Sequence, residues 1–217
     1  MLRREKIGLT QSKVVNNKVV NNMSKKKIAV TGGIGSGKST VMKIIAEQGY
    51  CTVSFDEVYR ELLDDERFVN DICDLVGVKP LIVDGKKTLD RHAVSERVFS
   101  DTKLLDKLNN FTHEKITKTA FNKGDLFDAD IVFYEVPLLF ESRLENLFDK
   151  VIVVMRNRAV RIADAARRDG RSVEEISLRA EKQFDYEKND LSLHIVIKND
   201  GDLKSLKQCV KKVLCEI

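Results

Sequence analysis

The chain has 217 residues, 42% of them hydrophobic and 33% charged, which is typical of a globular protein with one core. Its formal net charge is +4 without any run of five like charges, and no apolar run approaches the roughly 20 residues of a membrane-spanning helix, so we expect neither nucleic acid nor a membrane as a partner. The four cysteines form no CxxC pair, which argues against a zinc site or a disulfide framework and favours a cytoplasmic protein.

The first 24 residues are polar and contain the repeat VVNNKVVNN over 14–22, without the apolar centre of a signal peptide. Met23 stands directly before the first predicted strand. We interpret residues 1–24 as a disordered leader, or as an extension upstream of a natural start at Met23.

Apolar strands and helices alternate along the rest of the chain. Strands are predicted over 27–31, 51–55, 131–136, 151–155 and 195–198. Helices are predicted over 38–48, 58–75, 90–100, 102–121, 157–169 and 203–214, with one more opened by a Ser172–Glu175 capping box and a turn over 83–87. This alternation predicts an α/β fold with a five-stranded parallel sheet, as a single domain over 25–217. The helical stretch from about 62 to 125 interrupts it and is predicted to be an inserted lobe.

The glycine-rich segment GGIGSGKS over 32–39 matches the P-loop pattern GxxxxGK[ST], with a strand before it and a helix after it. Glycines let successive N–H groups point into one concavity at the positive end of the following helix, which suits a triphosphate. Lys38 would supply a positive charge to the β- and γ-phosphates, and the Ser39 hydroxyl would be a ligand for Mg²⁺. We therefore expect ATP with Mg²⁺ on these residues: Gly33, Ile34, Gly35, Ser36, Gly37, Lys38, Ser39 and Thr40.

Asp56 follows the second predicted strand, at the sheet edge where the P-loop leaves the first. Ligands of open α/β sheets bind along that edge, so Asp56 is expected to face the phosphates. It could accept the proton of an acceptor hydroxyl or hold the metal. The alternative is an N-cap of a helix starting at Glu57.

Seven arginines crowd the stretch 156–179, where a mobile helical lid could bring one or two of them onto the transferred phosphoryl group. The others are expected on a solvated helix face. The seven are Arg156, Arg158, Arg161, Arg167, Arg168, Arg171 and Arg179.

Three classes of P-loop protein compete. A GTPase switch needs a guanine-reading NKxD, which the string Lys198-Asn199-Asp200 does not match. A motor or transport ATPase carries an Asp at the end of an apolar strand, and the ending Tyr134-Glu135 fits this poorly. A small-molecule kinase needs a compact core, an inserted acceptor lobe and an arginine-bearing lid, and all three are predicted here.

From about Lys27 to its C-terminus the chain resembles the dephospho-coenzyme A kinase family. The resemblance is carried by TGGIGSGKST at 31–40, the 56–60 segment, VPLLFE at 136–141, RDG at 168–170, 179–183, and Val196-Ile197 with Asn199 and Gly201. It implies ATP-dependent phosphorylation of the ribose 3′-hydroxyl of dephospho-coenzyme A, giving coenzyme A and ADP. It also implies a substrate-binding insert at about 62–125, a lid at about 157–190, and a monomer or weak oligomer.

The resemblance also implies roles for single residues. Asp56 matches the family's proposed catalytic base, and Arg60 and His113 fall on positions in or near the acceptor site. Arg168 matches the lid arginine, and Asn199 lies in the stretch near the adenine. With Lys38 and Arg168, Asp56 forms the predicted catalytic set.

The chain departs from the family pattern at several points. Ser54 stands where the family often has the first Asp of D-x-D, and could hold a metal-bound water. Asp164 stands where the lid commonly has a second arginine, for which Arg161 or Arg167 could compensate. Glu114 and Leu193-His194 also differ from the family's usual residues. A kinase of another nucleoside or nucleotide, and a nucleotide-dependent switch protein, stay open as alternatives.

Overall fold

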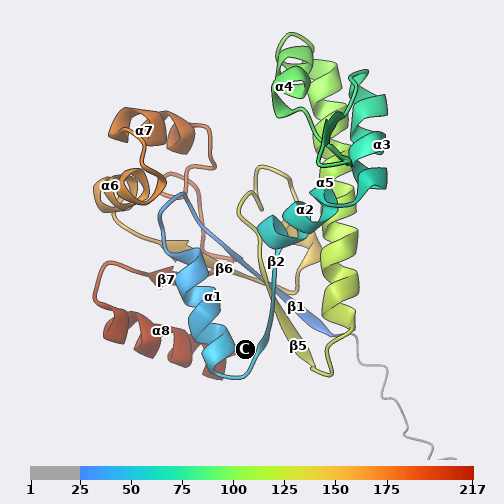
Figure 1. The fold of residues 1–217 in the computed structure, drawn as a ribbon. Coiled ribbons are helices and arrows are strands. Elements are labelled where there is room, and N and C mark those ends of the chain that lie inside the picture. The colour runs from blue at the N-terminus through green and yellow to red at the C-terminus, as the bar shows by residue number, and fades with distance from the viewer. Residues whose placement is uncertain (1–24) are drawn as a thin grey trace, which may run out of the picture.

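The computed structural model describes residues 25–217, which are built on one five-stranded parallel sheet with the strand order β2-β5-β1-β6-β7 (Figure 1). The strands are β1 (Lys26–Thr31), β2 (Cys51–Ser54), β5 (Ile131–Glu135), β6 (Lys150–Met155) and β7 (Ile195–Lys198). The predicted α/β fold with a five-stranded parallel sheet is therefore confirmed. The predicted leader, residues 1–24, lies outside the described residues.

Both faces of the sheet are covered, which explains why its central strands are apolar without interruption. On one face, α1 (Lys38–Glu47) and α8 (Leu203–Cys215) pack on Ile28 and Val30 of β1. On the other face, α2 (Phe55–Leu63) and α5 (Thr102–Asp125) pack around the intervening Ala29. Alternate residues of one strand thus supply two separate cores.

The prediction of one helix over 58–75 is wrong. The chain instead forms α2 and α3 (Glu66–Val76), with the break at Asp64 and Asp65. The Asp65 carboxylate accepts a hydrogen bond from the Arg67 N–H at 2.9 Å and caps α3. An aspartate in this position favours a new helix start over continuation, because its side chain satisfies a backbone donor that a helix start leaves free.

The insert also contains a hairpin, where only a turn over 83–87 was predicted from the sequence. Strands β3 (Leu81–Val83) and β4 (Lys86–Thr88) pair antiparallel across Asp84 and Gly85. Both turn residues have positive φ, 51° and 78°, as a tight Asp-Gly hairpin requires. With α3, α4 (Arg91–Phe99) and the first half of α5, the hairpin forms a lobe above the sheet with its own small core (Figure 1).

A second helical pair, α6 (Arg158–Asp169) and α7 (Val173–Glu181), stands above the same sheet edge on the side away from the insert (Figure 1). Gly170 ends α6 in the left-handed conformation with φ 62°, and the predicted Ser172–Glu175 capping box starts α7. A short 3₁₀ helix, η1 (Glu145–Leu147), precedes β6. Among residues 25–217, no helix combines the length and apolarity needed to cross a bilayer.

Candidate active site

The P-loop connects β1 to α1 and closes against two other segments. Gly37, the N-cap of α1, has φ 95°, and a Cβ there would lie 2.3 Å from the Asn199 side-chain nitrogen. A Cβ at Gly35, where φ is 73°, would lie 2.1 Å from the carbonyl oxygen of Arg161. Only glycine allows the loop to curl this tightly between α6 and the β7–α8 turn.

Lys38 is folded back across the loop. Its ammonium donates hydrogen bonds to the carbonyl oxygens of Gly32 at 2.7 Å and Gly33 at 3.1 Å. Burial lowers the pKa of Lys38 to about 8, although the carboxylates of Glu135 and Asp56 oppose the shift. The loop thus holds a poorly solvated cation, to which the phosphates of a nucleotide would be attracted.

Glu135 is a site residue that the sequence analysis did not assign. It is the last residue of β5, and its Oε1 accepts a hydrogen bond from the Ser39 hydroxyl at 2.8 Å. The pair forms because β5 lies between β1 and β2 in the sheet. A carboxylate ending an apolar strand was the available signal, but the sequence did not show that this strand is the neighbour of the P-loop strand.

Asp56 lies in the first turn of α2, with an exposed side chain. The N-cap of this helix is Ser54, whose Oγ accepts a hydrogen bond from the Glu57 N–H at 3.4 Å. The alternative interpretation of Asp56 as a helix cap is therefore wrong, because the helix starts two residues earlier than that interpretation required. The Asp56 carboxylate is left without a capping role and acts electrostatically on Lys38.

A cavity of about 300 Å³ opens beside Asp56, between α2, α5 and the loop that follows β5. His113 also lines it and lies 3.4 Å from the Ser142 hydroxyl, and burial lowers its pKa, so the imidazole is neutral at pH 7. Arg60 is exposed and is not part of this lining, and its Nε donates to the Asp56 carbonyl oxygen at 3.2 Å. The structure thus brings two of the three predicted acceptor residues to one cavity.

A second cavity, of about 470 Å³, lies over the P-loop and is closed by α6. It is lined by Lys38, Ser39 and Thr40 from the loop and α1, and by Arg156, Asp164 and Arg168 from the other side. The P-loop and the side chains of Arg156 and Arg168 therefore line the same cavity. Val136 lines the first cavity, and Glu135 before it bonds Ser39 of the second, so both cavities lie at the same edge of the sheet.

Comparisons with known proteins agree on one family. The family model described as dephospho-CoA kinase matches residues 26–205. The chain belongs to the dephospho-CoA kinase family. A dephospho-CoA kinase of Chlorobaculum tepidum is 35% identical over 192 residues, covering 86% of this chain and 92% of that protein. One of Corynebacterium glutamicum is 30% identical over 195 residues, covering 88% and 99%.

Two solved structures share the fold of this chain. A Thermus thermophilus protein, TT1252, superposes with a TM-score of 0.75 at 30% identity, covering 89% of this chain and 98% of that one. The dephospho-CoA kinase of Campylobacter jejuni superposes with a TM-score of 0.62, also at 30% identity, covering 88% and 96%. The fold expected from the family is the fold observed.

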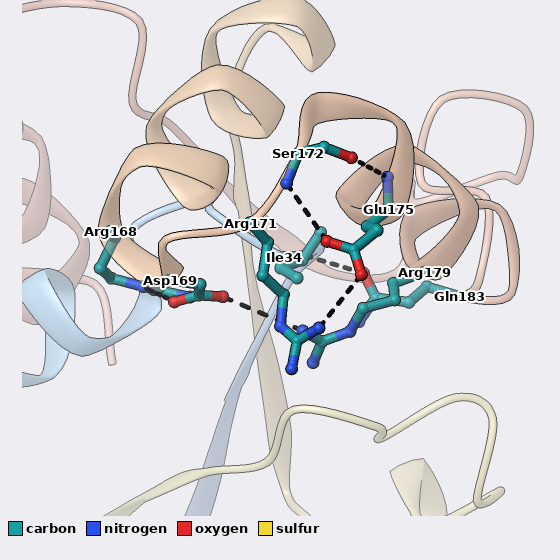
Figure 2. Close-up of polar contacts among 8 residues, drawn as sticks. All are labelled: Ile34, Arg168, Asp169, Arg171, Ser172, Glu175, Arg179 and Gln183. Carbon is teal, nitrogen blue, oxygen red and sulfur yellow. Dashed lines mark hydrogen bonds and ion pairs between the residues drawn. The ribbon is translucent and has the colours of Figure 1, made fainter.

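The lid arginines differ in what they contact. Arg168 is 64% exposed and donates from Nε to Asp169 Oδ1 at 2.7 Å, and Asp169 lies 4.0 Å from Arg179 (Figure 2). This hydrogen bond raises the pKa of Arg168 and lowers that of Asp169. Arg167 is 79% exposed and pairs with Asp164 at 2.9 Å. Arg168 reaches the P-loop cavity, and Arg167 is not among its lining residues.

Arg161 and Gln183 hold the two sides of one P-loop residue. The buried Arg161 donates from Nη1 to the Ile34 carbonyl oxygen at 3.0 Å. Gln183 Oε1 accepts a hydrogen bond from the Ile34 N–H at 2.8 Å (Figure 2). Of the two arginines considered as substitutes for the family's second lid arginine, Arg161 is therefore committed to the loop backbone.

Asn199 contacts the loop at its other end. Its side-chain amide donates to the Ser36 carbonyl oxygen at 2.9 Å, and its N–H donates to the Met155 carbonyl oxygen at 2.8 Å. The β7–α8 turn is thereby fixed beside Gly37. Contact between Asn199 and an adenine stays a prediction.

The family string VPLLFE has a structural role here. Glu141 Oε1 accepts a hydrogen bond from the Phe184 N–H at 2.8 Å, and the rings of Phe140 and Phe184 stack with centroids 4.4 Å apart. The loop that lines the cavity beside Asp56 is thus joined to the segment that follows α7. Because Gln183 lies in that segment, the same contacts also steady the side chain that holds Ile34.

Proposed function

We propose that this chain transfers the γ-phosphoryl group of ATP to the 3′-hydroxyl of the ribose of dephospho-coenzyme A, giving coenzyme A and ADP. The observation that carries the proposal is the position of Asp56, which lines a cavity at the same sheet edge as the P-loop cavity of Lys38 and Ser39. A carboxylate between an acceptor cavity and a P-loop is suited to a kinase. Membership of the dephospho-CoA kinase family identifies the acceptor.

In this mechanism the acceptor lies in the cavity beside His113, with its 3′-hydroxyl against Asp56. Asp56 accepts the hydroxyl proton as the phosphoryl group moves in line. Lys38 turns from the Gly32 and Gly33 carbonyls to the β- and γ-phosphates. Arg168, the exposed arginine of the P-loop cavity, stabilises charge on the transferred group.

The residues beside the loop fit a magnesium ion bound with ATP. Ser39 offers a hydroxyl oxygen. Its proton is donated to Glu135, which leaves the lone pairs of that oxygen available to the metal. Ser39 would hold the ion, with the Glu135 carboxylate orienting that hydroxyl and adding negative charge. When bound, Mg²⁺ would neutralise charge on the β- and γ-phosphates.

The second candidate is a kinase of another nucleotide, because the mostly apolar acceptor cavity carries no feature unique to one acceptor. A panel assay separates the two. Purified protein with ATP and Mg²⁺ is given dephospho-coenzyme A, nucleosides and nucleoside monophosphates, and ADP release is followed. Dephospho-coenzyme A should give the highest kcat/KM. Preference for another acceptor would favour the second candidate, and release independent of any acceptor would favour the switch protein.

Two further expectations belong to this proposal. We place the enzyme in the cytoplasm, and we expect a monomer or a weak oligomer. Sedimentation velocity at several protein concentrations tests the second expectation directly.

A further inference from the structure

Arg156 lines the P-loop cavity together with Arg168, but the proposed mechanism gives it no role. It follows β6, and its Nη2 lies 2.8 Å from Oδ2 of Asp164 on α6. Its side chain is only 26% exposed. Asp164 also binds Arg167 at 2.9 Å through its other oxygen, so this carboxylate is fixed from both sides. Arg156 is thus held in place rather than free to rotate in solvent.

The position of Arg156 is tied to one end of the P-loop. Arg156 lines the 470 Å³ cavity together with Gly37 and Thr40. The next residue, Asn157, donates its N–H to the Asp200 carboxylate at 2.7 Å, which joins the start of α6 to the β7–α8 turn. Asn199 of that turn binds the loop at Ser36. Arg156 therefore lies near the start of α1, where Asn199 also contacts the loop.

The positive charge of Arg156 is not required to bind the phosphates. Lys38, the N–H groups of the loop and Arg168 would already bind them, and the ion pair with Asp164 offsets the charge of Arg156. What Arg156 still offers is the flat face of its guanidinium, which stacks well on aromatic rings. A nucleotide whose phosphates fill the loop would extend its base toward one end of this cavity.

We propose that Arg156, anchored by Asp164, stacks on the base of the bound nucleotide. The inference rests on the proposed function, since it takes ATP as the ligand. The same inference gives Asp164 a role. Asp164 holds the guanidinium of Arg156, the residue that directly follows β6, in position for the base. Neither Arg161, which binds Ile34, nor Arg167, which is 79% exposed, is placed to do this.

The test compares two ligands that share phosphates and differ in the base. Binding of ADP and of inorganic tripolyphosphate is measured by calorimetry, without acceptor, for the full chain and its variants. Arg156→Ala should weaken ADP binding by about 3- to 30-fold while leaving tripolyphosphate binding within about 2-fold. Arg156→Lys keeps the charge but loses the plane, so it should not restore ADP affinity. Arg167→Ala, which removes the other partner of Asp164, is the matched control and should change neither ligand.

Three results would overturn the inference. Equal loss of both ligands in Arg156→Ala, or full ADP affinity in Arg156→Lys, would mean that Arg156 contacts phosphate. Unchanged ADP binding in Arg156→Ala would mean that it contacts no part of the nucleotide. Failure of the proposed function looks different: ADP would then bind normally to the unmodified chain and dephospho-coenzyme A would not be phosphorylated.

Discussion

The Ser39 hydroxyl donates a hydrogen bond to the Glu135 carboxylate at 2.8 Å, across the sheet edge where β1 and β5 end side by side. On the neighbouring strand β2, the register partner of Glu135 is Ser54, whose hydroxyl is used to cap α2. The carboxylate nearest the predicted metal ligand is therefore on β5 rather than on β2. We therefore expect Glu135 to offset the missing first Asp of the family's D-x-D.

Glu135→Gln should weaken the use of magnesium. Partners that orient a metal ligand commonly contribute about 10- to 100-fold to metal affinity. We expect the Mg²⁺ concentration for half-maximal activity to rise about 10-fold or more, and the Mg²⁺-dependent gain in ADP affinity to shrink. Calorimetry with and without Mg²⁺ measures the second effect without turnover. Glu47→Gln changes an exposed carboxylate at the C-terminal end of α1, the end away from the P-loop, and should leave both quantities unchanged. An unaltered Mg²⁺ gain in Glu135→Gln would remove this residue from the metal site.

Asp56→Asn should lower kcat by about 10²-fold or more, because the amide cannot accept the hydroxyl proton. The KM for the acceptor should change little, since the amide keeps the size of the side chain. Steady-state kinetics with saturating ATP measure both constants. Asp64→Asn, at the other end of the same helix and exposed, serves as the control. Near-normal kcat in Asp56→Asn would exclude Asp56 as the base.

The low pKa of Lys38 predicts a proton uptake on nucleotide binding. Burial lowers this pKa to about 8 in the free protein, so the amine loses its charge as the pH rises through that value. The phosphates of bound ADP favour the ammonium form and raise the pKa again. Between about pH 8 and 9, ADP binding should take up a substantial fraction of one proton, and affinity should fall as the pH rises. Calorimetry in buffers of different ionisation enthalpy counts the protons. Lys38→Met should abolish the uptake, and its persistence in that variant would assign it to another group.

Gly37→Ala should damage both stability and nucleotide binding. A Cβ at Gly37 would meet the Asn199 side chain at 2.3 Å, at a residue with φ 95°. We expect a loss of about 1–3 kcal/mol in the free energy of unfolding, since backbone strain adds to a displaced hydrogen bond. Gly49→Ala is a matched control, because Gly49 has φ 89° and a Cβ there meets nothing within 4 Å. Urea unfolding should show a lower free energy of unfolding for both variants. ADP calorimetry should show weaker binding only for Gly37→Ala. Equal ADP binding in the two would contradict the role given to the Asn199 contact.

Local patterns in the sequence predict much of this fold. The P-loop spacing, the unbroken apolar strands and the Ser172–Glu175 capping box all depend on neighbours in the chain, and the structure contains each of them. The break at Asp64 was also local, but the apolar period continues across it and favours one long helix. The strands beside the Asp84-Gly85 turn have three residues each and are mostly exposed. They therefore show no clear alternation of apolar and polar residues from which a hairpin could be predicted.

The order of the strands in the sheet could not be predicted from the sequence. Glu135 and Ser39 are far apart in the chain and meet only because β5 inserts between β1 and β2. The contacts of Arg161 and Gln183 with Ile34 depend in the same way on how α6 and the segment after α7 fold over the loop. Such pairs follow from tertiary packing, and no spacing rule within one segment reveals them.

The proposed acceptor is the ribose 3′-hydroxyl of dephospho-coenzyme A. The most direct measurement is a reaction of purified protein with ATP, Mg²⁺ and dephospho-coenzyme A, with the product identified by mass and by ³¹P NMR. This proposal requires a product identical to coenzyme A, with one new phosphate on the 3′-oxygen and one ADP formed for each. A phosphate on any other atom, or ADP formed without a phosphorylated acceptor, would contradict it.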